Sequence, residues 1–241
     1  MAAVDVETAA RARAQAAAAS IRHPLTVLLL TLTFGTGLVD AVSYLGLGRV
    51  FSANMTGNVV LLGFGIAGGY DLPVVAPIVS LMAFLAGAAL GGALAQSIAH
   101  RHRAHLGAAL AIEVTLVAVA ALLTGLATVR PDAASGDIVI GLLALAMGVR
   151  NATVRRIAVP DLTTTVLTLT LTGLAADLRH LRANRTAAAR RSLAVLAMLS
   201  GALVGALLLK TSPAWVLALA AALAAIAGVG YLRHPSSGDG P

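Results

Sequence analysis

The chain has 241 residues, of which 59% are hydrophobic and 11% are charged, and its mean hydropathy is +0.90. A soluble protein of this length could not keep so much apolar surface away from water, so these residues must face lipid. The formal charge of +7 suggests nucleic acid, but the basic residues form short clusters at the ends of apolar segments instead of one basic face. Cysteine is absent, which excludes disulfides and thiolate metal sites.

Six apolar segments are long enough to cross a membrane, since a spanning helix needs about 20 mostly apolar residues. In chain order they are 24–48, 74–99, 106–129, 138–154, 192–209 and 214–232. The first is too long for the core of a signal peptide, contains Asp40 and precedes no cleavage site, so we expect it to remain as a span. Two further apolar segments, 56–69 and 163–176, are too short to cross on their own.

The distribution of Lys and Arg predicts the topology, because these residues accumulate on the cytoplasmic side. With six spans and two re-entrant short segments, thirteen arginines lie inside, and Arg49, Arg130 and Lys210 lie outside. If the short segments cross fully, giving eight spans, the balance falls to ten inside and six outside. The six-span arrangement is favoured. Both arrangements predict a bacterial inner-membrane protein with cytoplasmic tails at 1–23 and 233–241.

An internal repeat divides the single transmembrane domain, 24–232, into halves at about 24–129 and 138–232. The matching positions are 83–87 with Gly91 and 197–201 with Gly205, the polar breaks 54–58 and 161–165, and Gly37 with Asp40 against Gly148 with Asn151. Each half has three crossings, so the second is inverted relative to the first. The predicted fold is therefore an all-α polytopic membrane helix bundle of six full spans plus two re-entrant half-helices, in an inverted-topology repeat. Such repeats are typical of secondary transporters; chance similarity between Ala/Leu/Gly helices is the alternative.

The segments 37–41 (GLVDA), 51–58 (FSANMTGN), 149–152 (VRNA) and 159–165 (VPDLTTT) resemble the YoaK-like family of bacterial membrane proteins. The resemblance extends over nearly all of 24–232. It implies a multi-spanning membrane protein of a largely uncharacterised family that is often described as transporters, and it leaves the substrate open.

The two polar breaks are the predicted solute site. Thr56 and either Asp161 or Thr163 are suitable N-cap residues, and extended segments before them would bring both helix N-termini to the membrane midplane. Facing N-termini attract an anion or a strongly hydrogen-bonding solute. The predicted solute-binding residues are Asn54, Thr56, Asn58, Asn151, Asp161, Thr163 and Thr164. The alternative is that they only cap buried helices. Likewise Thr165, Thr168 and Thr172 could line a path or bond to their own backbone.

Ionisable residues inside the spans suggest two further roles. Glu113 and Arg150 fall at similar depths, about 10 and 12 Å from the cytoplasmic side at ~1.5 Å per residue, and are predicted to form an ion pair. Asp40 has no basic residue at its depth except Arg49, which can reach the outer interface, so we expect Asp40 to exchange protons and couple them to transport. A purely structural hydrogen bond is the alternative for Asp40.

These features predict a secondary transporter or permease of a small solute, an anion among the candidates, coupled to protons. A passive channel and a non-transporting scaffold or assembly protein are the alternatives. We expect no enzyme activity and no cofactor or metal, since all six histidines fall at span ends and no phosphate-binding loop occurs. The expected partners are the lipid bilayer, the solute and, as a further option, a second copy bound through Gly-rich helix faces.

Overall fold

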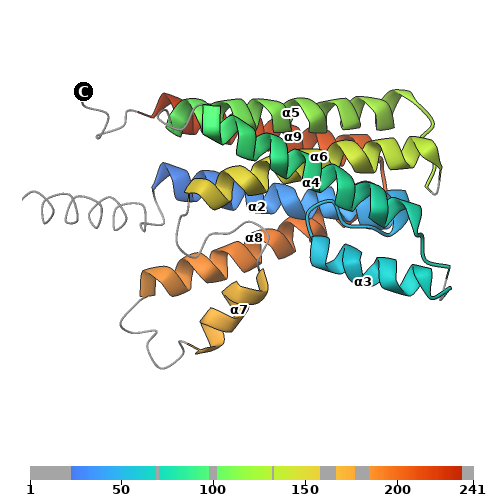
Figure 1. The fold of residues 1–241 in the computed structure, drawn as a ribbon. Helices are drawn as coiled ribbons and strands as arrows, with labels where there is room; N and C mark the ends of the chain where they lie inside the picture. Colours follow the sequence, from blue (N-terminus) through green and yellow to red (C-terminus); the bar gives the residue numbers. More distant parts are fainter. Residues whose placement is uncertain are drawn as a thin grey trace, which may run out of the picture.

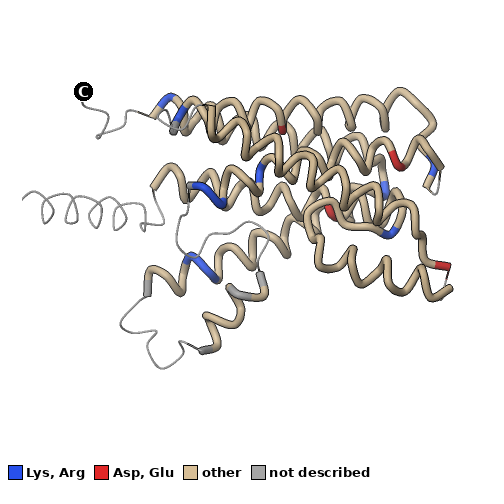
Figure 2. The backbone as a smooth tube through the Cα atoms, viewed as in Figure 1, with Lys and Arg blue, Asp and Glu red and all other residues tan. Residues whose placement is uncertain are grey.

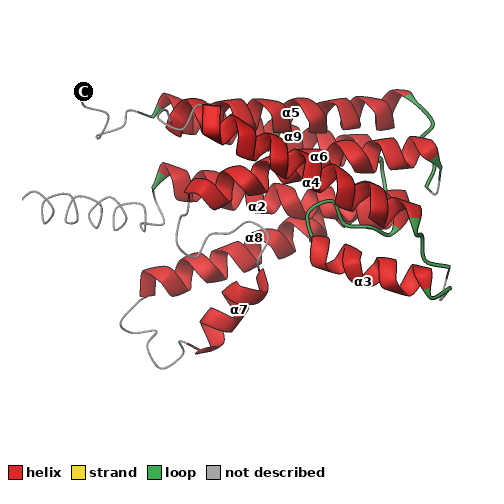
Figure 3. Cartoon of the chain, in the orientation of Figure 1, coloured by secondary structure: helices red, strands yellow, loops and turns green. Residues whose placement is uncertain are grey.

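The computed structural model describes residues 23–68, 71–97, 102–131, 133–157, 167–176 and 185–234, and every regular element in them is helical (Figures 1 and 3). Six helices have the length and composition of membrane spans, which confirms the predicted bundle. The elements are α2 (Pro24–Val42), the π-helix η1 (Ser43–Gly48), α3 (Met55–Ile66), α4 (Val75–Ser97), α5 (His102–Leu126), α6 (Ala134–Ile157), α7 (Leu167–Ala176), α8 (Arg185–Leu209) and α9 (Pro213–Arg233).

The helix ends follow local sequence signals. In α2 the side chain of His23 accepts the amide of Leu25, and in α9 Ser212 does the same for Ala214; each helix then has proline in its first turn. The helices α5, α6 and α8 extend beyond their apolar segments into polar sequence. Alanine and arginine, which flank these segments, are strong helix formers, so the helices continue past the hydrocarbon layer.

The two halves are related by matching helix pairs. Helices α2, α4 and α5 of the first half correspond to α6, α8 and α9 of the second. The contact of α2 with α8 matches that of α6 with α4, and the contact of α2 with α9 matches that of α6 with α5. Helices α5 and α9 also pack on each other. A side chain at Gly201 would meet the backbone carbonyl of Phe34, and one at Gly87 would meet that of Leu145. These contacts are equivalent, since Phe34 and Leu145 are matching positions in the two halves. The repeat predicted from sequence is therefore a repeat of tertiary contacts.

The partner faces of these pairs match as well. A Cβ atom at Gly148 would lie 2.8 Å from the amide nitrogen of Ala88, and one at Gly37 would lie 2.5 Å from the carbonyl oxygen of Met198. Only glycine allows the two backbones to approach so closely. The Gly-rich faces are thus occupied inside the chain, and the predicted homodimer through them stays a prediction.

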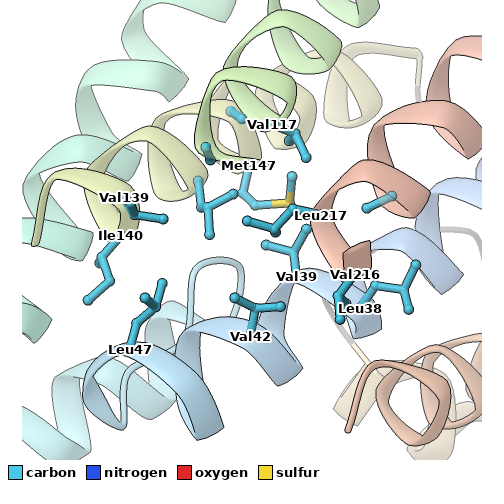
Figure 4. Close-up of a cluster of buried hydrophobic side chains, with 14 of the residues drawn as sticks. Leu38, Val39, Val42, Leu47, Val117, Val139, Ile140, Met147, Val216 and Leu217 are labelled. Carbon is cyan, nitrogen blue, oxygen red and sulfur yellow. The ribbon is translucent and has the colours of Figure 1, made fainter. Parts of the chain in front are cut away.

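The centre of the bundle is packed with apolar side chains. Val39 from α2, Val117 from α5, Met147 from α6 and Leu217 from α9 converge there, each 0–2% exposed (Figure 4). Because these side chains fill the space between the four helices, the centre of the bundle is not an open path in this structure.

The short helices α3 and α7 lie outside this centre. Helix α3 packs on α4, and α7 packs on α8. Each begins toward the middle of the bundle and runs to the opposite end from the other (Figure 1). At 12 and 10 residues they are half-length elements, as the sequence predicts.

Basic residues gather at one end of the bundle (Figure 2). Helices α2, α5 and α8 begin at this end and α4, α6 and α9 finish there (Figure 1). Arg103 lies in the first turn of α5, Arg155 and Arg156 in the last turn of α6, and Arg233 in the last turn of α9. We call this the basic end.

Candidate functional site

A pocket of about 480 Å³ lies between the two half-helices. Its described lining is Tyr44, Phe51, Asn54, Thr56, Gly57, Val60, Leu61 and Thr168. Thr168 belongs to α7. Asn54 is the N-cap of α3, and Thr56, Gly57, Val60 and Leu61 lie within α3. Thr168 at the start of α7 therefore lines the same pocket as the start of α3. Asp161, Thr163, Thr164 and Thr165 lie outside the described residues.

The N-cap of helix α3 lies two residues earlier than predicted. Its N-cap is Asn54, whose side-chain oxygen accepts the amide of Gly57 at 3.3 Å. Thr56, predicted to be the cap, lies in the first turn with its side chain exposed at the pocket. The prediction of the cap was wrong because asparagine and threonine are both good caps, and the bend of the preceding loop decides between them.

Asn58 holds the loop that leads into α3. The amide of Phe51 donates to Asn58 Oδ1 at 2.8 Å, and Asn58 Nδ2 donates to the carbonyl of Phe51 at 2.6 Å and to Ser80 Oγ at 3.0 Å. Ser80 in α4 also donates to the Phe51 carbonyl, at 2.7 Å. Both polar side chains are fully buried. In the described structure Asn58 supports the pocket wall and does not line it.

Other predicted polar residues have local partners. Asn151, the counterpart of Asp40 in the second half, is half-buried and donates from Nδ2 to the carbonyl of Met147 at 2.8 Å. Thr172 donates to the carbonyl of Thr168 at 2.9 Å, as the backbone-bonding alternative predicts. Of these, Thr168 is the one that faces the pocket.

Sequence analysis missed the aromatic wall of the pocket. The rings of Tyr44 and Phe51 stack with centroids 4.8 Å apart and an angle of 21° between their planes. Tyr44 lies in the π-helix η1, and such π turns occur often at functional sites. Aromatic residues form only 3% of the chain, so two of them shortly before a polar break were an available signal.

Asp40 joins α2 to the same loop. Its Oδ1 atom accepts the amides of Ser52 at 2.9 Å and Ala53 at 3.0 Å, and the residue is 6% exposed. Asp40 was predicted to have no partner, but two backbone amides donate hydrogen bonds to its carboxylate. Arg150 interacts with Asp40 electrostatically, whereas Arg49 is exposed. Asp40 thus holds the backbone directly before Asn54, which lines the pocket.

Glu113 and Arg150 form a buried ion pair. Arg150 Nε donates to Glu113 Oε2 at 2.8 Å and Nη2 contacts Oε1, with both side chains at most 3% exposed. Nη1 donates to the carbonyl of Leu32 at 2.8 Å and to Thr36 Oγ1 at 2.7 Å. The guanidinium therefore ties α6 to both α5 and α2. Its donors are thus engaged, and its charge offsets that of the buried Glu113 carboxylate.

Within the described part of the chain, no group of three or more His, Asp or Glu side chains is arranged to hold a metal ion.

Comparison with known proteins identifies the family. Residues 28–230 match the family described as "Protein of unknown function (DUF1275)". The chain is 33% identical over 162 residues to the UPF0700 transmembrane protein YoaK of Bacillus subtilis (strain 168), which covers 67% of this chain and 69% of that protein. No solved structure matches the chain. The matched region contains both half-helices and all six spans except the first four residues of the first and the last three of the last, and the chain therefore belongs to the DUF1275 family of YoaK-like membrane proteins.

Proposed function

We propose that this protein is a secondary transporter of a small solute in the bacterial inner membrane, with its basic end in the cytoplasm. The observation that carries the proposal is the pocket shared by α3 and α7, one half-helix from each inverted half. Discontinuous helices that meet between inverted repeats are how many transporters build a solute site near the midplane. The excess of arginine at the basic end supports its assignment to the cytoplasm.

The chemistry of the pocket supports a small solute with several hydrogen-bond acceptors. The first turn of α3 presents backbone amides and a partial positive charge, and Asn54, Thr56 and Thr168 add side-chain donors. The stacked rings of Tyr44 and Phe51 add an apolar wall, and the Phe51 ring packs against the first turn of α3 at Gly57. An anion is among the candidates because the partial charge of a helix N-terminus favours it.

We further propose that Asp40 couples protons to solute movement. Its carboxylate fixes the amides of Ser52 and Ala53, between the pocket residues Phe51 and Asn54. A charged acceptor makes stronger bonds to backbone amides than a protonated one. Proton uptake at Asp40 would therefore weaken the attachment of the loop to α2 and allow the pocket wall to move.

The test is uptake by the purified protein in proteoliposomes from a bacterial metabolite extract, with the contents analysed by mass spectrometry. An imposed pH gradient should concentrate at least one solute in wild-type vesicles. Asp40→Asn should abolish this accumulation and leave exchange of the same solute largely intact. Asp137→Asn, which makes the same change in the first turn of α6, should accumulate the solute normally.

Two rivals give different results in the same vesicles. A passive channel would equilibrate a solute without concentrating it, whatever the pH gradient. A scaffold or assembly protein would give no flux above that of empty vesicles. Accumulation that survives in Asp40→Asn would leave a transporter but overturn the coupling role of Asp40.

A further inference from the structure

Two buried oxygen atoms beside the pocket lack protein partners. Asp40 Oδ2 and Ser52 Oγ make no hydrogen bond within the described structure, although Asp40 is 6% and Ser52 0% exposed. The two residues are already in contact, because Asp40 Oδ1 accepts the amide of Ser52 at 2.9 Å. Polar atoms buried in this way are costly unless something bonds to them. Because these two atoms do not bond to each other, a ligand that contacts both would satisfy both.

The net charge of the bundle interior indicates which kind of ligand would suit these two oxygen atoms. Apart from the first six and the last six residues of each described span, the ionisable side chains are Asp40, Glu113 and Arg150. Arg150 is bound to Glu113, so one carboxylate remains unmatched. A water molecule would supply hydrogen bonds but leave this negative charge in place. A single positive charge would neutralise it, whereas a divalent cation would leave an excess.

The helix becomes irregular shortly after Asp40. The π-helix η1 starts three residues after Asp40, and Ser43 Oγ at its first position donates to the carbonyl of Asp40 at 3.3 Å. Carboxylate, hydroxyl and carbonyl oxygens at a break in a membrane helix are the ligands that transporters use for sodium ions. Ser52 is fully buried, so an ion bound there would be enclosed by protein.

We propose that Asp40 Oδ2 and Ser52 Oγ bind one sodium ion when Asp40 is ionised. A proton and the ion compete for the same carboxylate oxygen, so the site is filled by one or the other. Arg150 on α6 is the charged side chain that acts on Asp40 from a neighbouring helix, and its own charge is matched by Glu113 on α5. The proposed ion site depends only on Asp40 and Ser52. It could therefore bind sodium even if the protein transports no solute.

The test is thermal unfolding of the purified protein in detergent at pH 8, with NaCl, KCl or choline chloride at equal ionic strength. Bound ligand stabilises the folded state by mass action, so the wild-type Tm should rise with sodium and not with choline. Asp40→Asn should lose the sodium-dependent rise, and Ser52→Ala should need several-fold more sodium to reach it. Ser200→Ala is the matched control, because that exposed hydroxyl bonds only to its own helix, and it should respond like wild type. At pH 5 the wild-type rise should be smaller, because protons compete with sodium for the Asp40 carboxylate.

Three outcomes would overturn the proposal. The first is an equal Tm in sodium and choline for the wild type at pH 8. The second is an equal rise with potassium, which would remove the assignment to sodium. The third is a wild-type response from both Asp40→Asn and Ser52→Ala. Size-exclusion profiles of each variant establish that it is folded before its Tm is compared. None of these results depends on solute uptake, so failure here and failure of the transport proposal are distinguishable.

Discussion

Arg150 and Glu113 face each other across the contact between α6 and α5, and the guanidinium also reaches the Leu32 carbonyl on α2. This one side chain therefore joins helices from both inverted halves. Its counterpart in the first half is Val39, and the counterpart of Asp40 in the second half is Asn151. The backbone repeat is symmetrical, but the ionisable side chains inside the spans are not.

The first prediction concerns this ion pair. Glu113→Gln leaves the Arg150 charge buried without compensation, which should cost about 3 kcal/mol or more and lower the yield of folded protein. Glu113→Gln combined with Arg150→Gln should recover much of that yield, since no net charge remains. Arg155→Gln at an exposed position is the control and should behave like wild type. Fluorescence-detected size exclusion of membrane extracts measures the yield; purely additive losses would show that the pair contributes no coupling energy.

A second prediction uses two neighbouring glycines in α4. A methyl group at Gly91 would lie 2.9 Å from Ala152 Cβ and 3.0 Å from the Val149 carbonyl, whereas nothing lies within 4 Å of one at Gly92. Gly91→Ala should therefore lower the Tm by forcing α4 and α6 apart. Gly92→Ala should leave the Tm unchanged or raise it slightly, because alanine is the better helix former by about 1 kcal/mol.

The repeat extends this comparison to the other half. Gly205→Ala on α8 should reproduce the effect of Gly91→Ala, since a methyl group there would lie 2.8 Å from Ala41 Cβ. If Gly91→Ala and Gly92→Ala unfold at the same temperature, close backbone approach does not hold these helices together.

Sequence patterns predicted much of this architecture because membrane spans are defined by length and hydrophobicity alone. The short helices, the repeat and the contact between Glu113 and Arg150 follow from counting residues along a rigid helix. Other features depend on where the chain bends. The cap at Asn54, the π-helix and the burial of Asn58 behind Phe51 all follow from the path of the loop 49–54. Arg49, which has left-handed backbone angles although it is not glycine, marks that bend, and its identity gave no signal of it.

Topology can be tested directly because the chain contains no cysteine. A single cysteine at position 102 falls at the basic end, which we propose to be cytoplasmic, and one at Lys210 falls at the other. An impermeant thiol reagent added to intact cells should label the cysteine at 210 and not the one at 102. After lysis both should react. Labelling at 102 from outside would replace the six-span arrangement with one of eight spans, or reverse its orientation.

The last prediction tests whether the two half-helices meet at one site. Thr56 at the start of α3 and Thr168 at the start of α7 are far apart in sequence but line the same pocket. In the cysteine-free chain, Thr56→Cys with Thr168→Cys should be linked by a short bifunctional thiol reagent in native membranes. A protease site placed in the intervening chain would reveal the link, because the two fragments then stay together on a denaturing gel.

Thr56→Cys with Thr115→Cys is the control, since Thr115 is exposed on α5, which lies on the other side of the bundle (Figure 1). A metabolite that binds in the pocket should slow the reaction of the first pair and not that of single cysteines elsewhere. If the control pair links as efficiently as the first pair, α3 and α7 do not form a common site, and the solute pathway must be sought elsewhere in the bundle.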